Sequence, residues 1–362
     1  MRGTDTFTES LFCVRKLDDF VPSSHPLRSI RLMANEALAK MDRVFAGMYE
    51  ADIKGGRPSI APEKLLRAML LQVLYSIRSE RQLMEQTQYN LLFRWFIGLS
   101  MDDSVWVPTV FTKNRERLIR HDAVVEFFNE VLCIAQKKNW LSGEHFSVDG
   151  TLIQAWAGHK SFKPKDGPPP PPDGRGGVNF RGRPRCNDTH ASSTDPEAKS
   201  ARKGPGKEAK LSFGGHALME NRNGLCVDIR VSCALETESA AAAELLRRQA
   251  RKRLKPTSLG ADKGYHNKAF VGLLRRRGIR PHIAQIQGRD TPGLDARTTR
   301  HTSYAVSQRK RKRVEEIFGW MKSWGGLRRT RFRGIARVQL HAHFVGAAYN
   351  LLRLSRLRPL TV

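Results

Sequence analysis

Apolar residues recur at helical spacing through the first third of the chain. Residues 27–49 carry such a pattern, and Pro62 is suited to the first turn of the apolar helix that follows it. Ser79 is a suitable cap for a helix running from Glu80 to about Phe96, which Gly98 would end. We therefore expect an all-helical domain over residues 27–140, preceded by an irregular arm over residues 1–26.

From about residue 141 the pattern becomes that of short strands alternating with helices. The run EHFSVDGT, residues 144–151, predicts a strand with Asp149 at its end. The elements expected after it are a hairpin of residues 211–220 and 225–234, a helix of residues 238–253, a strand of residues 257–261 reaching Asp262, a further helix, a strand of residues 280–284, an irregular segment of residues 286–306 and a final helix of residues 341–353. This order predicts a mixed sheet with helices on its faces over residues 141–355.

A compositional break interrupts this second region. Residues 160–210 contain five consecutive prolines (Pro168–Pro172), repeated glycines and the basic run RGRPR. Such a composition does not bury a core, so it predicts a flexible insertion. A linker or a basic arm that contacts DNA is favoured, with a domain-recruiting ligand as the alternative.

The segment Arg309–Lys322, RKRKRVEEIFGWMK, combines a charge run with an amphipathic helix. At about 100° per residue its apolar positions form one stripe toward the core: Val314, Ile317, Phe318 and Met321. Arg311, Glu315 and Lys322 fall together along one edge of that stripe, whereas Glu316 points nearly the opposite way. Taken alone, the segment is better explained as a solvated charge run ahead of an amphipathic helix.

The charge of the chain favours a polyanionic partner. The 362 residues include 63 Lys and Arg against 35 Asp and Glu, a formal net charge of +28. Nucleic acid is the first expectation, with a membrane surface as the competitor. No apolar run approaches the roughly 20 residues that span a bilayer, and the N-terminus lacks the pattern of a signal peptide. Five scattered cysteines fit reduced thiols, so we expect a cytoplasmic protein.

One helix of the N-terminal region is a candidate for reading DNA. Residues 107–120 would expose Lys113, Arg115, Arg117 and Arg120, which suits the recognition helix of a helix-turn-helix arrangement. An ordinary helical bundle with a basic surface explains the same pattern.

Three carboxylates stand out in a chain with this much positive charge. Asp149 alone is explained as a turn or cap residue, but with Asp262 and Glu315 it makes a possible set. Clustered acids resist joint ionisation and repel DNA, so the set makes sense if it holds hard divalent cations. Two such ions about 4 Å apart support in-line phosphoryl transfer.

These residues resemble the motifs of bacterial insertion-sequence transposases of the Asp-Asp-Glu type, in the group related to insertion sequences four and five. The matching stretches are FSVDGTLIQAWA around Asp149, LGADKGYHNK around Asp262, and a signature Tyr-x-x-Arg-x-x-x-Glu-x-x-x-x-x-x-Lys in which Arg311, Glu315 and Lys322 keep the spacing. The tyrosine position of the signature falls at Gln308, a departure from the family pattern. The resemblance extends from about Pro26 to Leu352.

The resemblance implies a ribonuclease-H-like catalytic core that cuts DNA at terminal inverted repeats and joins the 3′ ends to target DNA. It also implies two Mg²⁺ ions, for which Mn²⁺ would substitute, and a homodimer or larger assembly on paired ends, associated with the nucleoid. Arg311, Lys322, Lys113, Arg115 and Trp320 would contact DNA, although Trp320 is equally explained as a core residue. Glu316 replaces Glu315 if the helical register differs. Two rivals remain: a non-catalytic DNA-binding repressor derived from a transposase, and a ribonuclease-H-like nuclease without strand transfer.

Overall fold

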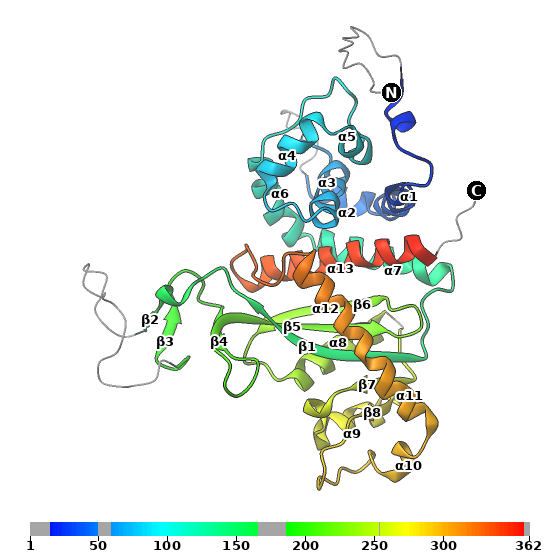
Figure 1. Cartoon of the computed structure of the whole chain (residues 1–362), viewed down its shortest axis with the longest axis vertical. Helices are drawn as coiled ribbons and strands as arrows, with labels where there is room; N and C mark the ends of the chain where they lie inside the picture. The colour runs from blue at the N-terminus through cyan, green and yellow to red at the C-terminus, as the bar shows by residue number, and fades with distance from the viewer. Residues whose placement is uncertain (1–14, 50–58, 166–185, 253, 358–362) are drawn as a thin grey trace, which may run out of the picture.

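A computed structural model describes residues 15–49, 59–165, 186–252 and 254–357. Figure 1 shows a helical part above a mixed sheet, with a smaller lobe below it that carries α9 and α10. The helices of the first part are η1 (Leu17–Phe20), α1 (Pro26–Leu38), α2 (Asp42–Ala46), α3 (Pro62–Leu74), α4 (Glu80–Tyr89), α5 (Leu91–Ile97), α6 (Thr109–Arg120) and α7 (Ala123–Lys137). Among the described residues, no helix combines the length and the apolar character that crossing a membrane requires.

Local signals set most ends of these helices. Pro62 opens α3, and the Ser79 hydroxyl accepts a hydrogen bond of 3.2 Å from the Gln82 amide at the start of α4. The predicted helix from Glu80 to Phe96 is two helices, because the Asn90 side chain caps a new one, α5. Gly98 ends α5 with a left-handed φ of 87°, as predicted.

The sheet has the mixed strand arrangement expected from the sequence. Its strands are β1 (His145–Gln154), β4 (Lys199–Ala201), β5 (Lys210–Glu220), β6 (Cys226–Cys233), β7 (Ser258–Ala261) and β8 (Arg280–Ile283). β5 pairs antiparallel with β1, β4 and β6, whereas β1, β7 and β8 are parallel. Three antiparallel strands followed by two strands parallel to the first form the ribonuclease-H-like mixed-sheet core, so the predicted fold class is confirmed.

The first strand is longer than predicted. Asp149 does not end β1 but lies within it, because the pairing with β5 continues past Asp149 and Gly150 as far as Gln154. The sequence Asp-Gly indicated a turn, and the ladder of hydrogen bonds to β5 overrides that local preference.

Part of the predicted flexible insertion has regular structure. β2 (Phe162–Pro164) pairs with β3 (His190–Ser192), and β4 pairs with the start of β5. The prediction of a flexible segment over residues 160–210 is therefore wrong for these strands, whose backbone hydrogen bonds are made with other strands. The run Pro168–Pro172 lies outside the described residues.

The chain ends in helices that cover the sheet. These are α8 (Glu238–Arg251), η4 (Lys263–Tyr265), α9 (Lys268–Arg276), α10 (Ala296–Thr299), α11 (Thr302–Lys310), η5 (Arg311–Arg313), α12 (Val314–Ser323) and α13 (Ile335–Leu357), with η3 (His159–Ser161) earlier in the chain. Residues 286–306 were expected to be irregular, yet they contain α10 and most of α11. The single helix expected from Arg309 to Lys322 is broken at η5, although its apolar stripe in α12 is buried as predicted.

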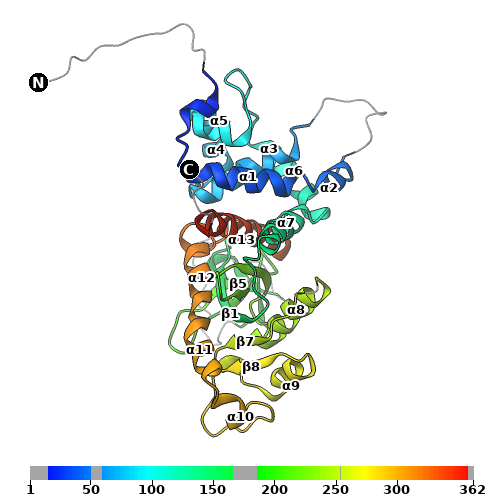
Figure 2. The ribbon, with the colours of Figure 1, turned by 90° about the vertical axis from the view of Figure 1, so that its right-hand side faces the viewer.

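The two faces of the sheet are covered by different helices. In Figure 2, α12 lies on one side of the strands and α8 on the other. Phe146 and Val148 of β1 belong to the core beneath α8 and α9, whereas Ile153 belongs to the core shared with α12, α13 and the N-terminal helices. Because successive side chains of a strand alternate, Asp149 and Thr151 lie on the same face as Ile153, beneath α12.

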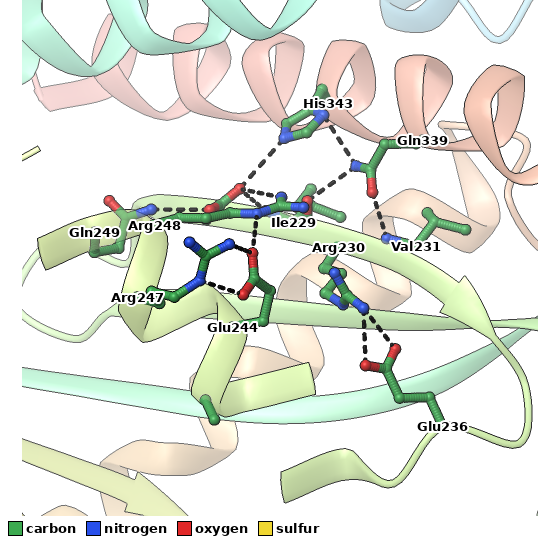
Figure 3. Close-up of polar contacts among 12 residues, drawn as sticks. Ile229, Arg230, Val231, Glu236, Glu244, Arg247, Arg248, Gln249, Gln339 and His343 are labelled. Carbon is green, nitrogen blue, oxygen red and sulfur yellow. Dashed lines mark hydrogen bonds and ion pairs between the residues drawn. The ribbon is translucent and has the colours of Figure 1, made fainter. Parts of the chain in front are cut away.

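A buried carboxylate ties α8 and α13 to the sheet (Figure 3). Asp228 of β6 accepts a hydrogen bond from Gln249 of α8 at 2.9 Å and lies 3.3 Å from His343 of α13. Burial alone would raise the pKa of Asp228, but the contacts with His343 and nearby cations hold it below its usual value. His343 is a core residue, and Asp228 fixes the helix that begins at Glu238.

Candidate active site

Asp149 and Asp262 lie side by side although 113 residues separate them. The parallel register of β1 and β7 pairs Ser147 with Gly260. Asp149 and Asp262 each follow two residues later, so the same register places them at neighbouring positions. The carboxyl end of β7 is therefore where the two aspartates meet.

The signature segment crosses the same strands. A β-carbon on Gly260 would meet the Arg311 β-carbon at 3.2 Å, so η5 lies directly against β7. Glu315 follows one turn later in α12, which contacts β1. The structure thus brings all three predicted acids to one region of the sheet, and each comes from a different element.

The electrostatics of Asp149 reflect this crowding. Burial raises the pKa of Asp149, and the negative charges of Asp262 and Glu315 raise it further. The Gly150 amide, which donates a 2.8 Å hydrogen bond to Asp149 Oδ1, and the Arg311 guanidinium act in the opposite direction. The net effect is a carboxyl group that resists ionisation unless positive charge is supplied.

A fourth acid, Glu238, was missed by the sequence reasoning. A β-carbon on Gly150 would meet Glu238 Oε1 at 3.0 Å, and one on Gly264 would meet Glu238 Oε2 at 3.1 Å and Asp262 Oδ1 at 3.0 Å. Glu238 as a whole residue is exposed, but protein surrounds part of its carboxyl group. This burial raises the pKa of Glu238, and the negative charges of Asp262 and Asp149 raise it further. In the sequence Glu238 looks like an ordinary acid in the first turn of a helix.

Gln308, at the tyrosine position of the signature, supports Arg311. Its side-chain amide donates a 2.5 Å hydrogen bond to the His282 carbonyl and accepts one of 3.0 Å from Arg311 Nε. Tyr304, one helical turn earlier, donates a 2.8 Å hydrogen bond to the carbonyl of Ile283 in the same strand. The departure from the family pattern therefore leaves Arg311 anchored to β8.

Lys322 is held above β1. Its ammonium group donates a 2.5 Å hydrogen bond to the Thr151 hydroxyl, two residues beyond Asp149. Burial lowers the pKa of Lys322, and the nearby charges of Lys203 and Arg328 lower it further. A cation placed among other cations is suited to an anionic group such as a backbone phosphate.

Glu316 and Trp320 lie elsewhere on α12. Glu316 pairs with Arg353 of α13 at 3.0 Å, away from the aspartates. Trp320 is partly buried and packs edge-to-face on Tyr349, with ring centres 5.7 Å apart. Trp324 is the more accessible of the two tryptophans, at 52% exposed.

The basic residues of α6 divide into two groups. Lys113 and Arg120 are exposed, as expected. The exposure predicted for Arg115 is wrong: its guanidinium pairs with Glu80 at 2.5 Å and lies over the Phe332 ring. Arg117 is also partly covered, against Tyr49.

A large cavity in the described part of the chain is separate from the acids. It has a volume of about 890 Å³ and lies between the N-terminal helices and the segment after α12, beside Trp156, Arg329 and Arg331. Among the described residues, no three His, Cys, Asp or Glu side chains are already arranged around a single metal ion. Oxygen donors predominate around Asp149, however, and such donors suit hard divalent cations.

Comparison with known proteins identifies both parts of the chain. Residues 140–351 match the family described as "Transposase DDE domain", and residues 15–117 match that described as "Transposase domain (DUF772)". No curated protein matches.

Two solved structures are similar at low identity. One is a piggyBac transposase synaptic complex with hairpin DNA, at 11% identity and a TM-score of 0.42, covering 91% of this chain and 75% of that one. The other is a Mos1 transposase paired-end complex with the left transposon end, at 13% identity and a TM-score of 0.22, covering 79% and 76%. Since the DDE match spans more than half of the residues, this chain belongs to the transposase DDE domain family and is a DNA transposase.

Proposed function

We propose that this transposase cuts DNA at the terminal inverted repeats of its element and joins the 3′ ends to target DNA, as a member of the group related to insertion sequences four and five. The observation that carries the proposal is the meeting of Asp149 and Asp262 on parallel strands beneath the helix of Glu315. We assign the catalytic role to these three acids.

Two Mg²⁺ ions are the proposed cofactors, with Mn²⁺ as a substitute, and Asp149, Asp262 and Glu315 would hold them. The donor set fits, because its oxygens suit hard cations and because added positive charge relieves the repulsion that raises the pKa of Asp149. When bound, such ions activate a water or a 3′-hydroxyl and stabilise the departing oxygen.

The surrounding side chains position the DNA. Lys322, fixed by Thr151, and Arg311, fixed by Gln308, would contact backbone phosphates on either side of the acids. Because both cations are already held by the protein, little side-chain freedom is lost when the phosphates arrive. Trp320 would contact displaced bases only if its packing against Tyr349 opens, so the exposed Trp324 is the better candidate for stacking.

The N-terminal region would bind the repeat sequence. We propose residues 27–140 as the helix-turn-helix-like DNA-binding domain and residues 141–355 as the catalytic domain, with residues 1–26 as an arm. Lys113 is free to reach DNA, whereas Arg115 would support the helix through Glu80. A homodimer or larger assembly would hold two ends of the element together.

The test is incubation of the purified protein with the DNA that flanks its own gene, with Mg²⁺, and mapping of the cut ends to the nucleotide. Cuts at the ends of inverted repeats, followed by joining of the 3′ ends, support the proposal. Asp149→Asn is the control for contaminating nucleases. Binding without cutting would leave a repressor, and cutting without joining would leave a nuclease.

A further inference from the structure

A second charged cavity lies beside the edge strand β8. In Figure 1, β8, α9 and α10 lie at the opposite end of the sheet from the N-terminal helices. The cavity has a volume of about 320 Å³. Three arginines (Arg275, Arg280, Arg297), two histidines (His282, His301) and two hydroxyl residues line it, and they come from α9, β8, α10 and the start of α11. None of the acids proposed for catalysis is among them.

The protein neutralises the positive charge of the lining only in part. None of the lining residues is a carboxylate, although Asp295 at the start of α10 pairs with Arg297 at 2.8 Å. Among the described residues, Arg280 has no ion-pair partner and is exposed. Like charges gathered around one cavity repel one another, and an anion that enters the cavity relieves this repulsion.

His282 supplies an independent sign of a ligand site. Its side chain is 4% exposed, and its Nδ1 atom is buried with no hydrogen-bond partner. Burial, then the charges of His145, Arg280 and Arg275, lower the pKa of His282 to about 4. A buried polar atom without a partner is costly, and His282, which carries one, is a lining residue of this cavity.

The cavity is also built with fixed walls. Arg275 donates hydrogen bonds to the Gly293 carbonyl at 2.8 Å and to the Thr298 hydroxyl at 2.5 Å, which holds its guanidinium against α10. Planar guanidinium groups present several N–H donors in a geometry that matches phosphate oxygens. The size, the donors and the charge therefore suit a tetrahedral oxyanion.

We propose that this cavity binds a phosphodiester group of the DNA backbone, at a point distinct from the cleavage site. The inference rests on the proposed function, because that function supplies the DNA. The cavity is connected to the signature segment through one residue: the His282 side chain lines the cavity, while its carbonyl accepts the hydrogen bond of Gln308, which in turn holds Arg311. DNA anchored here would follow β8 toward the acids.

The test compares Arg280→Gln with Arg276→Gln. Both residues are exposed arginines and they lie four positions apart, but Arg276 is not among those that line the cavity. Each change is made in the Asp149→Asn protein without Mg²⁺, and affinity for a duplex of the flanking DNA is measured by fluorescence anisotropy over a range of salt. Arg280→Gln should weaken binding several-fold and reduce the salt slope by about 1, whereas Arg276→Gln should leave the slope unchanged. Equal effects of the two changes would overturn the proposal.

A second measurement separates a DNA site from an ion site. Inorganic phosphate and the duplex are each titrated into the protein while the His282 ring is followed by NMR, with His282→Gln assigning the signal. Binding of either ligand in the cavity raises the pKa of His282 from about 4. A response to phosphate but not to DNA would refute the DNA site. Neither experiment requires cleavage. Failure to find strand transfer would therefore not decide whether this cavity binds DNA.

Discussion

Arg353 Nη1 lies 3.0 Å from Glu316 Oε2, and this contact between α13 and α12 directs Glu316 away from the paired aspartates. Glu315, its neighbour, is the glutamate whose charge raises the pKa of Asp149. The two glutamates could be exchanged only by a shift of helical register, and the burial of Val314 and Ile317 opposes such a shift.

The first prediction separates the two glutamates. Glu315→Gln should reduce Mg²⁺-dependent strand cleavage by on the order of 10³-fold or more, because it removes one of the acids proposed to hold the ions. Glu316→Gln should leave cleavage unchanged and cost less than about 1 kcal/mol in the free energy of unfolding, because its ion pair is exposed. Cleavage assays and urea denaturation measure the two effects, and equal losses of activity would show that the assignment is wrong.

The second prediction concerns metal binding at Asp149. Asp149→Asn should abolish cleavage and also remove the rise in melting temperature that Mg²⁺ gives the unmodified protein. Without metal the variant should be at least as stable as the original, because a carboxyl group with a raised pKa is lost. Differential scanning fluorimetry with and without Mg²⁺ tests both statements. Asp295→Asn, which lies outside the acid set, is the matched control and should keep the Mg²⁺ effect.

The third prediction uses the shared influence of Asp262. Its charge raises the pKa of both Asp149 and Glu238, so Asp262→Asn should lower both values. Carboxyl ¹³C NMR titration in the absence of metal measures them. If neither pKa moves, the three groups are farther apart in solution than this arrangement requires.

The fourth prediction concerns Lys322. Lys322→Ala should weaken binding of DNA that spans the cleavage site, because the ammonium group fixed by Thr151 is lost, while Mg²⁺ still raises the melting temperature. Thr151→Val keeps the cation but removes its hydrogen bond, so it should have the smaller effect on affinity. Loss of the Mg²⁺ effect with affinity for DNA intact would reverse the role given to Lys322.

The fifth prediction is that stability falls in mild acid. Burial lowers the pKa of His216 from 6.5 to about 4, so between these values the unfolded chain binds a proton that the folded protein does not. The free energy of unfolding therefore decreases as pH falls from about 6.5, by roughly 2–3 kcal/mol for such a residue when pH reaches 4. His282 acts in the same direction.

Denaturation at several pH values checks this sign. His216→Gln should remove the part of the pH dependence of the unfolding free energy that His216 contributes. A slope that is unchanged in this variant would mean that other groups control the acid response.

The sequence alone determined those features whose cause is local. Pro62 at the start of a helix, the hairpin turn that ends at Gly224 with a φ of 68°, and the buried stripe that includes Val314 and Met321 all follow from neighbouring residues. The three acids were also identified from the spacing of motifs in the sequence. The match to the transposase DDE domain family is consistent with these motifs.

Tertiary structure decided what depends on contacts between distant segments. β1 runs past Asp149 because β5 pairs with it, and β2 forms because β3 pairs with it. Glu238 joins the acids because its helix, α8, packs against β1 and β6, where Gln249 bonds Asp228. Spacing along the chain carries no record of such pairings, since strand register and helix docking are fixed by partners many residues away.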